Sequence, residues 1–135
     1  MIRHILALTL LALLTACASG GGDSALLPRL GEFDVPRPLA DVYVSEVRML
    51  RGCKAGPVSN IYDIAIDPRF EVKQNRAVID IIGTGIGDPH IWATITLDAL
   101  GAQTTHVRLT AAPRHDGLQN LRTDIERWGN AAGGC

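Results

Sequence analysis

The chain has 135 residues, and its 13 Lys and Arg against 14 Asp and Glu give a formal charge of −1 at pH 7. This balance lacks the basic excess typical of proteins that bind nucleic acid or an anionic membrane surface, so we expect no nucleic-acid partner. Aromatic residues make up only 4% of the chain, which argues against an aromatic-lined pocket for sugars or exposed bases. The length suits one modest domain.

The first 16 residues are organised like a secretory signal peptide. Arg3 precedes a run from Ile5 to Leu14 that is apolar except for Thr9, and small residues follow this run. The competing interpretation is a membrane-spanning helix, which needs about 20 apolar residues. Because the apolar run stops before Cys17, it is too short to span a bilayer. The sequence therefore predicts a signal peptide at residues 1–16.

The stretch Leu14-Thr15-Ala16-Cys17 resembles the bacterial lipobox, a Leu followed by two small residues and a Cys. The resemblance is to small lipoproteins of Gram-negative bacteria and covers residues 1–18. It implies cleavage just before Cys17 and attachment of a diacylglyceryl group and further acyl chains, such as palmitate, to that residue. In the enteric members, Asp after the lipidated Cys retains the protein at the inner membrane, so Ala18 implies the outer membrane. The alternative is a signal peptide without lipid, cut elsewhere.

Residues 17–38 are expected to form the lipidated Cys and a flexible tether. A Gly-rich and Ser-containing run at 19–24 is followed by Pro28, Pro36 and Pro38, and these prolines discourage regular structure. A flexible tether of this length has a root-mean-square reach of about 25 Å. The domain is therefore expected to stay close to the membrane.

Residues 39–53 are predicted to form a helix. Apolar side chains recur at helical spacing on one stripe, which consists of Leu39, Val42, Tyr43, Val47, Leu50 and Cys53. Arg48 and Arg51 lie outside this stripe, and Pro38 suits a first helical position. The β-prone run at 42–44 leaves a strand as the alternative.

Four later segments alternate apolar and polar residues, a pattern typical of strands with one covered face. They are residues 61–66, 77–81, 90–98 and 102–111. The period of two in all four predicts an antiparallel sheet.

The last two of these segments are predicted to form a hairpin. A three-residue loop at 99–101, with a glycine in the left-handed conformation, would pair Asp98 with Ala102. That register places Trp92 opposite Arg108 on the polar face of the hairpin, because residues that pair must face the same side of the sheet.

The final element is predicted to be a helix whose apolar residues recur at three, four and three. These residues are Leu118, Leu121, Ile125 and Trp128. Asp116 and Gln119 resemble a capping box, and Gly129 is placed to end the helix.

These elements predict one α+β domain over residues 39–135. Its four-stranded antiparallel sheet carries the N-terminal and the C-terminal helix on one face, since the apolar stripes of both helices need a surface to cover. The alternative is a small β-sandwich in which residues 39–53 are not helical.

With Cys17 lipidated, Cys53 and Cys135 are the cysteines that remain. They are predicted to form a disulfide, because an exported chain meets an oxidising compartment. Two free thiols are the alternative. No metal site is predicted at these cysteines, because no further Cys or His stands at ligand spacing.

Two features of the middle of the chain invite a chemical interpretation. The run Gly83–Gly87 follows a strand, but it lacks the spacing of a phosphate-binding loop and no helix follows it, so we predict a hairpin loop and no cofactor. His90 and His106 lie on adjacent predicted strands and, with Asp80 or Asp88, could form a metal or acid/base site. A surface histidine on the polar face of a strand is the favoured interpretation.

The sequence as a whole indicates a non-enzymatic lipoprotein anchored on the periplasmic side of the outer membrane, which binds a partner in the cell envelope. The predicted docking face consists of Trp92, His106 and Arg108, since Trp and Arg are enriched in binding hot spots. A surface contact between Trp92 and Arg108 with no partner is the favoured interpretation of this row, and the docking face is its alternative. The alternative function is a small periplasmic metal-binding protein or hydrolase that uses His90 and His106.

Overall fold

The computed structural model describes residues 28–112, 118 and 120–135. The predicted signal peptide and lipobox lie outside the described residues, as do Asp116 and Gln119 of the predicted capping box.

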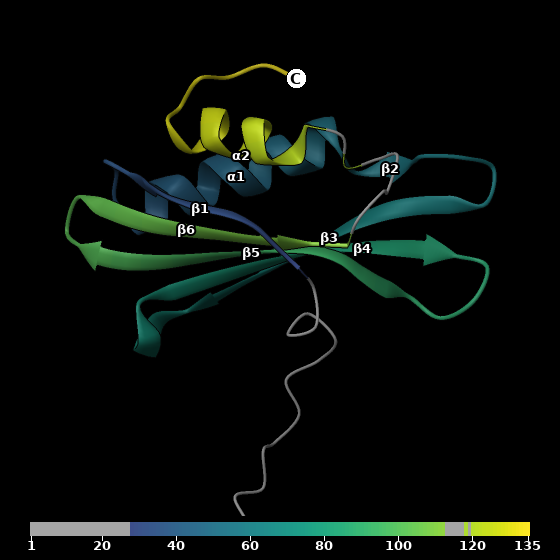
Figure 1. Ribbon diagram of the computed structural model, residues 1–135, viewed down its shortest axis with the longest axis horizontal. Coiled ribbons are helices and arrows are strands. Elements are labelled where there is room, and N and C mark those ends of the chain that lie inside the picture. The colour runs from purple at the N-terminus through teal and green to yellow at the C-terminus, as the bar shows by residue number, and fades with distance from the viewer. Residues whose placement is uncertain (1–27, 113–117, 119) are drawn as a thin grey trace, which may run out of the picture.

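A sheet of six antiparallel strands is the centre of the fold (Figure 1). The strands are β1 (Arg29–Val35), β2 (Gly56–Pro57), β3 (Tyr62–Glu71), β4 (Arg76–Gly85), β5 (His90–Gly101) and β6 (Thr104–Ala111). Their order across the sheet is β1-β6-β5-β4-β3-β2. A 3-10 turn, η2 (Val72–Gln74), connects β3 to β4.

Two helices, α1 (Leu39–Cys53) and α2 (Leu121–Gly129), lie on the same face of the sheet (Figure 1). Helix α1 contacts β3, β4, β5 and β6, and α2 packs against α1 and β1. The core lies between these two layers. Its fully buried side chains include Leu50 from α1, Ile79 and Ile95 from the sheet, and Ile125 and Trp128 from α2.

The domain is a mixed α+β domain, but the prediction of a four-stranded sheet is wrong. The missed strand β1 lies in the segment assigned to the tether, where prolines argued against regular structure. Pro28 and Pro36 stand just outside the two ends of β1, so neither removes a hydrogen bond from its pairing with β6. The second missed strand, β2, has only two residues and pairs with Ile64 and Asp63, and a strand this short has no readable period.

Helix α1 has the predicted bounds, so the predicted helix is confirmed and the alternative of a strand is excluded there. The apolar stripe of α2 is also confirmed, since Leu121, Ile125 and Trp128 are buried. The two helices cover the sheet, so the β-sandwich alternative is excluded for the described residues.

The hairpin of β5 and β6 has the predicted faces but not the predicted register. The chain turns at Ala102 and Gln103, because β5 continues to Gly101 and β6 begins only at Thr104. As a result Asp98 pairs with His106, and Arg108 pairs with Thr96 instead of Trp92. The observed partner of Asp98 lies four residues beyond the predicted one. Because this shift is an even number of residues, the apolar positions of β6 still face the core.

Trp92 lies in the core, and the prediction that it is exposed on the polar face is wrong. Ala93 pairs with Ile81 and Ile91 pairs with the next residue, Ile82, so Trp92 is the extra residue of a bulge. A bulge turns its extra side chain away from the strict alternation of a strand. Trp92 is 8% exposed and packs over Gly83, with its ring edge-on to Tyr62 at a centroid distance of 6.1 Å.

The close contact of Gly83 with Trp92 gives a first testable prediction. A β-carbon at position 83 would lie 2.0 Å from Cε2 of the Trp92 ring. We expect Gly83→Ala to lower the free energy of unfolding by about 1–3 kcal/mol, because overpacking displaces neighbouring side chains. Urea unfolding measures this change.

Gly52→Ala is the matched control, because a β-carbon at Gly52 meets no atom within 4 Å. Gly52 lies in α1, where Ala is favoured by up to about 1 kcal/mol, so this variant should be as stable as the parent chain or more so. Equal stability of Gly83→Ala and the parent chain would contradict the packing of Trp92 over Gly83.

The predicted loop at residues 83–87 is shorter than expected. Gly83 and Gly85 belong to β4, and residues 86–89 make the connection to β5. Gly83 is required by the Trp92 ring, while Gly85 has a φ of 156° and lies against the carbonyl oxygen of Ile61. The glycines of this segment therefore serve packing as well as the loop.

The predicted disulfide between Cys53 and Cys135 is confirmed. It joins the last residue of α1 to the last residue of the chain, with 5.4 Å between the two Cα atoms. The C-terminal tail passes over α2 on its way to this bond (Figure 1), and the indole Nε1 of Trp128 donates to the carbonyl of Gly134 at 3.0 Å.

Candidate functional site

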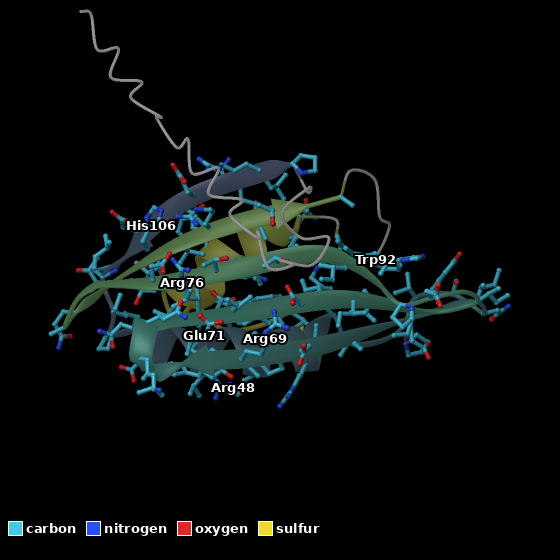
Figure 2. All side chains as sticks on the ribbon, turned by 90° about the horizontal axis from the view of Figure 1, so that it is seen from below. Arg48, Arg69, Glu71, Arg76, Trp92 and His106 are labelled. Atoms are coloured by element: carbon cyan, nitrogen blue, oxygen red, sulfur yellow. A yellow bond between two sulfur atoms is a disulfide. The ribbon has the colours of Figure 1, made fainter. Side chains whose placement is uncertain are left out.

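The face of the sheet opposite the helices is covered by charged and polar side chains (Figure 2). Strand alternation places them there, since the intervening residues enter the core. One row of cross-strand neighbours runs through Asp34, His106, Asp98, Arg76 and Glu71, each from a different strand. The signs alternate along this row when the histidine is protonated, which favours each neighbouring pair.

The arginines of this sheet face already have carboxylate partners. Nε of Arg76 donates to Oδ1 of Asp98 at 2.6 Å, and this hydrogen bond, together with the charge of Asp98, raises the pKa of Arg76. Arg108 lies 3.9 Å from carboxylate oxygens of both Glu32 and Asp98. These pairs are partly exposed, so each contributes little to stability. They nevertheless occupy the guanidinium groups of both arginines with carboxylates of the protein itself.

Asp80 is 2% exposed although it faces the uncovered side of the sheet. Its carboxylate accepts hydrogen bonds from Arg69 and from Oγ1 of Thr94, the latter at 2.6 Å. Asp67 holds the same guanidinium at 3.3 Å. Asp80 is thus satisfied within the sheet, and its partners explain its burial without a ligand.

The structure does not assemble the predicted docking face. His106 and Arg108 lie on the uncovered sheet face, but Trp92 lies on the opposite side, in the core. The ring of His106 is held by Asp34, with Nδ1 2.6 Å from Oδ1, and its Nε2 is 3.8 Å from Glu32. Figure 2 shows His106 and Trp92 at well-separated places on the sheet.

His90 and His106 are also not brought together. His106 pairs with Asp98, which is eight residues further along β5 than His90. At about 3.4 Å per residue, this places the two histidines roughly 27 Å apart along the strand direction. Within the described part of the chain, no three His, Cys, Asp or Glu side chains are grouped so that they could hold a metal ion.

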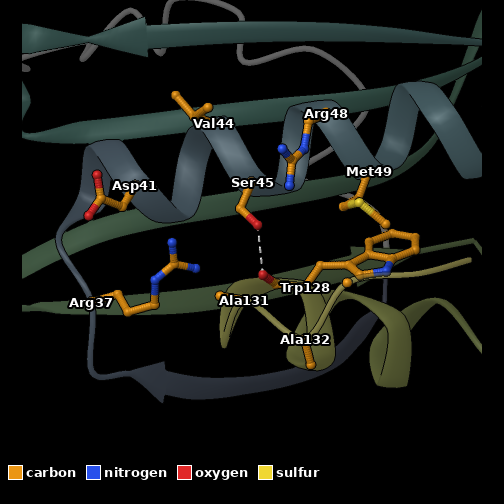
Figure 3. Close-up of a pocket in the computed structure, with 10 residues that line it drawn as sticks. Arg37, Asp41, Val44, Ser45, Arg48, Met49, Trp128, Ala131 and Ala132 are labelled. Atoms are coloured by element: carbon orange, nitrogen blue, oxygen red, sulfur yellow. Dashed lines mark hydrogen bonds between the residues drawn. The ribbon is translucent and has the colours of Figure 1, made fainter.

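A polar hollow of about 290 Å³ opens between α1 and the C-terminal tail (Figure 3). It is lined by Arg37, Asp41, Val44, Ser45, Arg48, Met49, Trp128, Ala131, Ala132 and Gly133. Two hydrogen bonds fix its walls, since Ser45 Oγ donates to the carbonyl of Trp128 at 2.8 Å and Arg37 Nη1 to that of Gly129 at 2.7 Å. The disulfide at Cys135 holds the tail that closes it.

An apolar groove of about 560 Å³ lies on the other flank of α1, against β3. It is lined by Tyr43, Val44, Val47, Arg48, Arg51 and Pro68. Val44 is 63% exposed, and the Tyr43 ring stacks edge-on against Phe70, which is itself 40% exposed. Exposed apolar side chains that gather along one groove are typical of interaction sites.

The arginines beside these two hollows differ from those of the sheet face. Neither Arg48 nor Arg51 has a carboxylate within 4 Å among the ion pairs of the described residues, and the same is true of Arg37. The carboxylate of Asp41 at the polar hollow is also unpaired in this sense. The only sequence signal for this site was that Arg48 and Arg51 stand outside the apolar stripe of α1.

Glu46 is a buried carboxyl group that the sequence analysis missed. It is fully buried, and neither carboxyl oxygen has a hydrogen-bond partner among the described residues. Desolvation raises the pKa of Glu46 to about 9, against the opposing charge of Arg37. Glu46 was missed although it lies four residues from both Val42 and Leu50, at a stripe position where a charged residue is unexpected.

Comparison with known proteins gives no match to a family model, to a curated protein or to a solved structure. In the described part of the chain, neither helix has the length and apolar character needed to cross a membrane. The features of the chain that bear on function are therefore the lipobox-like stretch before the domain and the hollows on either side of α1.

Proposed function

We propose that the protein is a lipoprotein held by Cys17 at the periplasmic side of the outer membrane, where its domain serves as a non-enzymatic binding module. The observation that carries this proposal is the stretch Leu14-Thr15-Ala16-Cys17 directly after an apolar segment too short to span a bilayer. The disulfide between Cys53 and Cys135 supports it, because disulfides persist in oxidising compartments such as the periplasm.

The length of chain before the domain fits a membrane-proximal position. Eleven residues lie between Cys17 and the first residue of β1, Arg29. A chain of that length spans at most roughly 40 Å. An acylated Cys17 therefore keeps the domain within about one domain diameter of the bilayer surface.

The binding role is supported by the contrast between the two faces of the domain. Arg76 and Arg108 on the sheet face are engaged with carboxylates, while Arg48 on α1 has no such partner in the described part of the chain. The hollows beside α1 thus offer unused cationic and apolar surface, and recognition sites combine these two features.

Replacing the acylated residue tests the proposal. We expect Cys17→Ser to leave the mature chain without lipid, so that it moves from the detergent phase to the aqueous phase of a detergent phase-partition assay. Acyl chains supply the anchor at about 0.8 kcal/mol per buried methylene, and no other anchoring segment is proposed. Mass measurement of the mature chain reports the acyl groups directly.

Thr15→Ala is the control, because it keeps a small residue at that position of the lipobox and should leave acylation unchanged. A Cys17→Ser chain that is still processed before residue 17 and still partitions with detergent would overturn the proposed anchor.

A further inference from the structure

The polar hollow and the apolar groove are neighbours on the surface of α1. They share two lining residues, Val44 and Arg48, which are four positions apart and therefore stand one above the other on the helix. A ligand that crosses α1 at Val44 contacts both hollows. The two hollows form one continuous surface with a polar end and an apolar end.

The polar end is cationic. Figure 3 shows the guanidinium groups of Arg37 and Arg48 extending toward the region around Ser45. Arg37 uses Nη1 for the carbonyl of Gly129, and its remaining donors are not used in the hydrogen bonds of the described residues. Among the described residues that line this hollow, Asp41 is the one carboxylate, so the arginines outnumber it two to one.

The apolar end offers mainly apolar side chains together with two arginines. Its apolar lining consists of Tyr43, Val44, Val47 and Pro68, and the two arginines are Arg48 and Arg51. An extended apolar group placed here covers Val44, which is otherwise largely exposed to water. The arginines of the groove and of the polar hollow favour a ligand that also carries an anionic group.

We propose that this surface binds a long-chain fatty-acid anion, with its acyl chain in the apolar groove and its carboxylate at the guanidinium groups of Arg48 and Arg37. Arginine is suited to this role because its fork of donors matches the two oxygens of a carboxylate. The inference rests on the proposed role as a binding module and names its ligand class, but it does not depend on the anchor at Cys17.

The test uses the mature chain, residues 17–135, with Cys17→Ser, so that no acyl chain on the protein competes. Titration calorimetry with hexadecanoate below its micellar concentration should give saturable binding of one anion per chain. Arg48→Glu should weaken this binding at least tenfold, since it reverses the charge shared by both hollows. Arg48→Lys should give an intermediate loss, because it keeps the charge but not the fork.

Lys73→Glu is the matched control, since it makes the same change of charge at an exposed residue that lines neither hollow. It should bind hexadecanoate like the parent chain. Val44→Asp should abolish binding by placing a like charge between the two hollows. Circular dichroism of each variant checks that the domain is folded, and all three substituted residues are exposed.

Three further probes separate the parts of the ligand. Hexadecanol tests the acyl chain without charge, acetate tests the carboxylate without a chain, and a lysophospholipid with an anionic phosphate tests the competing headgroup. The proposal is overturned if hexadecanoate does not bind, if Arg48→Glu and Lys73→Glu bind it equally, if hexadecanol or acetate binds as tightly, or if the lysophospholipid binds more tightly. Failure of this test leaves the partition of Cys17→Ser unaffected, so the two proposals fail separately.

Discussion

Removing the bond between Cys53 and Cys135 is expected to lower the free energy of unfolding by about 4.5 kcal/mol. The bond closes a loop with a sequence separation of 82 residues, which contains strands β2 to β6 and helix α2, so it restricts this part of the chain in the unfolded state. In the chain-entropy description the stabilisation grows with the logarithm of loop length. A loss of this size is a large share of the stability of a small domain.

Urea unfolding of the double variant Cys53→Ser, Cys135→Ser measures the loss against the oxidised parent chain. The parent chain in the presence of a reductant is the control, and it should unfold at the same urea concentration as the double variant. A difference below about 1 kcal/mol would contradict the entropic account of this bond.

The loss of the disulfide in this double variant should also affect the proposed binding site. The tail residues Ala131, Ala132 and Gly133 line the polar hollow, and the tail is held by the disulfide and by the hydrogen bond from Trp128 to Gly134. Without the disulfide this wall is free to open, so hexadecanoate binding should weaken even where the rest of the domain stays folded. The disulfide therefore connects the stability of the fold with the shape of the hollow.

Periodicity predicted the parts of the fold in which apolar residues recur at regular spacing over several helical turns or along a whole strand. Helix α1 was placed with its observed bounds, and alternation assigned the core-facing residues of β4 and β6 correctly. In β5 the assignment holds from Ala93 to Leu97 but fails at Trp92. Strand β1 was missed because its prolines were read as breakers, although they flank the strand and do not interrupt it. The edge position of β1 is a long-range property, set by its pairing with β6.

The candidate site was harder to predict, because it depends on single residues that break a pattern. Trp92 is buried through a bulge, and nothing in the alternation of β5 marks where an extra residue enters. The hollows beside α1 are made by a helix, a strand and the C-terminal tail, which are far apart in the sequence. Only the position of Arg48 outside the apolar stripe was visible beforehand.

Glu46 is the most consequential of these exceptions, and it should make the stability of the domain depend on pH. Burial raises the pKa of Glu46 to about 9 in the folded chain, while the ordinary value of 4.5 applies when the chain is unfolded. Between these two values the folded chain keeps a proton that the unfolded chain has released. The free energy of unfolding therefore falls as the pH rises through this window, by about 1.4 kcal/mol per pH unit.

Glu46→Gln removes this titration while it keeps the size of the side chain and a neutral amide in place of the neutral acid. At pH 5 the variant should be as stable as the parent chain to within about 1 kcal/mol. At pH 8 it should be more stable by about 4 kcal/mol, because only the parent chain has lost stability over the three pH units. Urea unfolding of both chains at pH 5 and pH 8 measures the difference.

Glu126→Gln on α2 is the matched control, since Glu126 is exposed and its side chain makes no hydrogen bond in the described structure. This variant should keep the pH dependence of the parent chain, because it removes a carboxylate without removing a buried proton. If Glu46→Gln and the parent chain lose the same stability between pH 5 and pH 8, then Glu46 is not held in its neutral form between α1, Val35 of β1 and Gly129 of α2, where its carboxyl group lies.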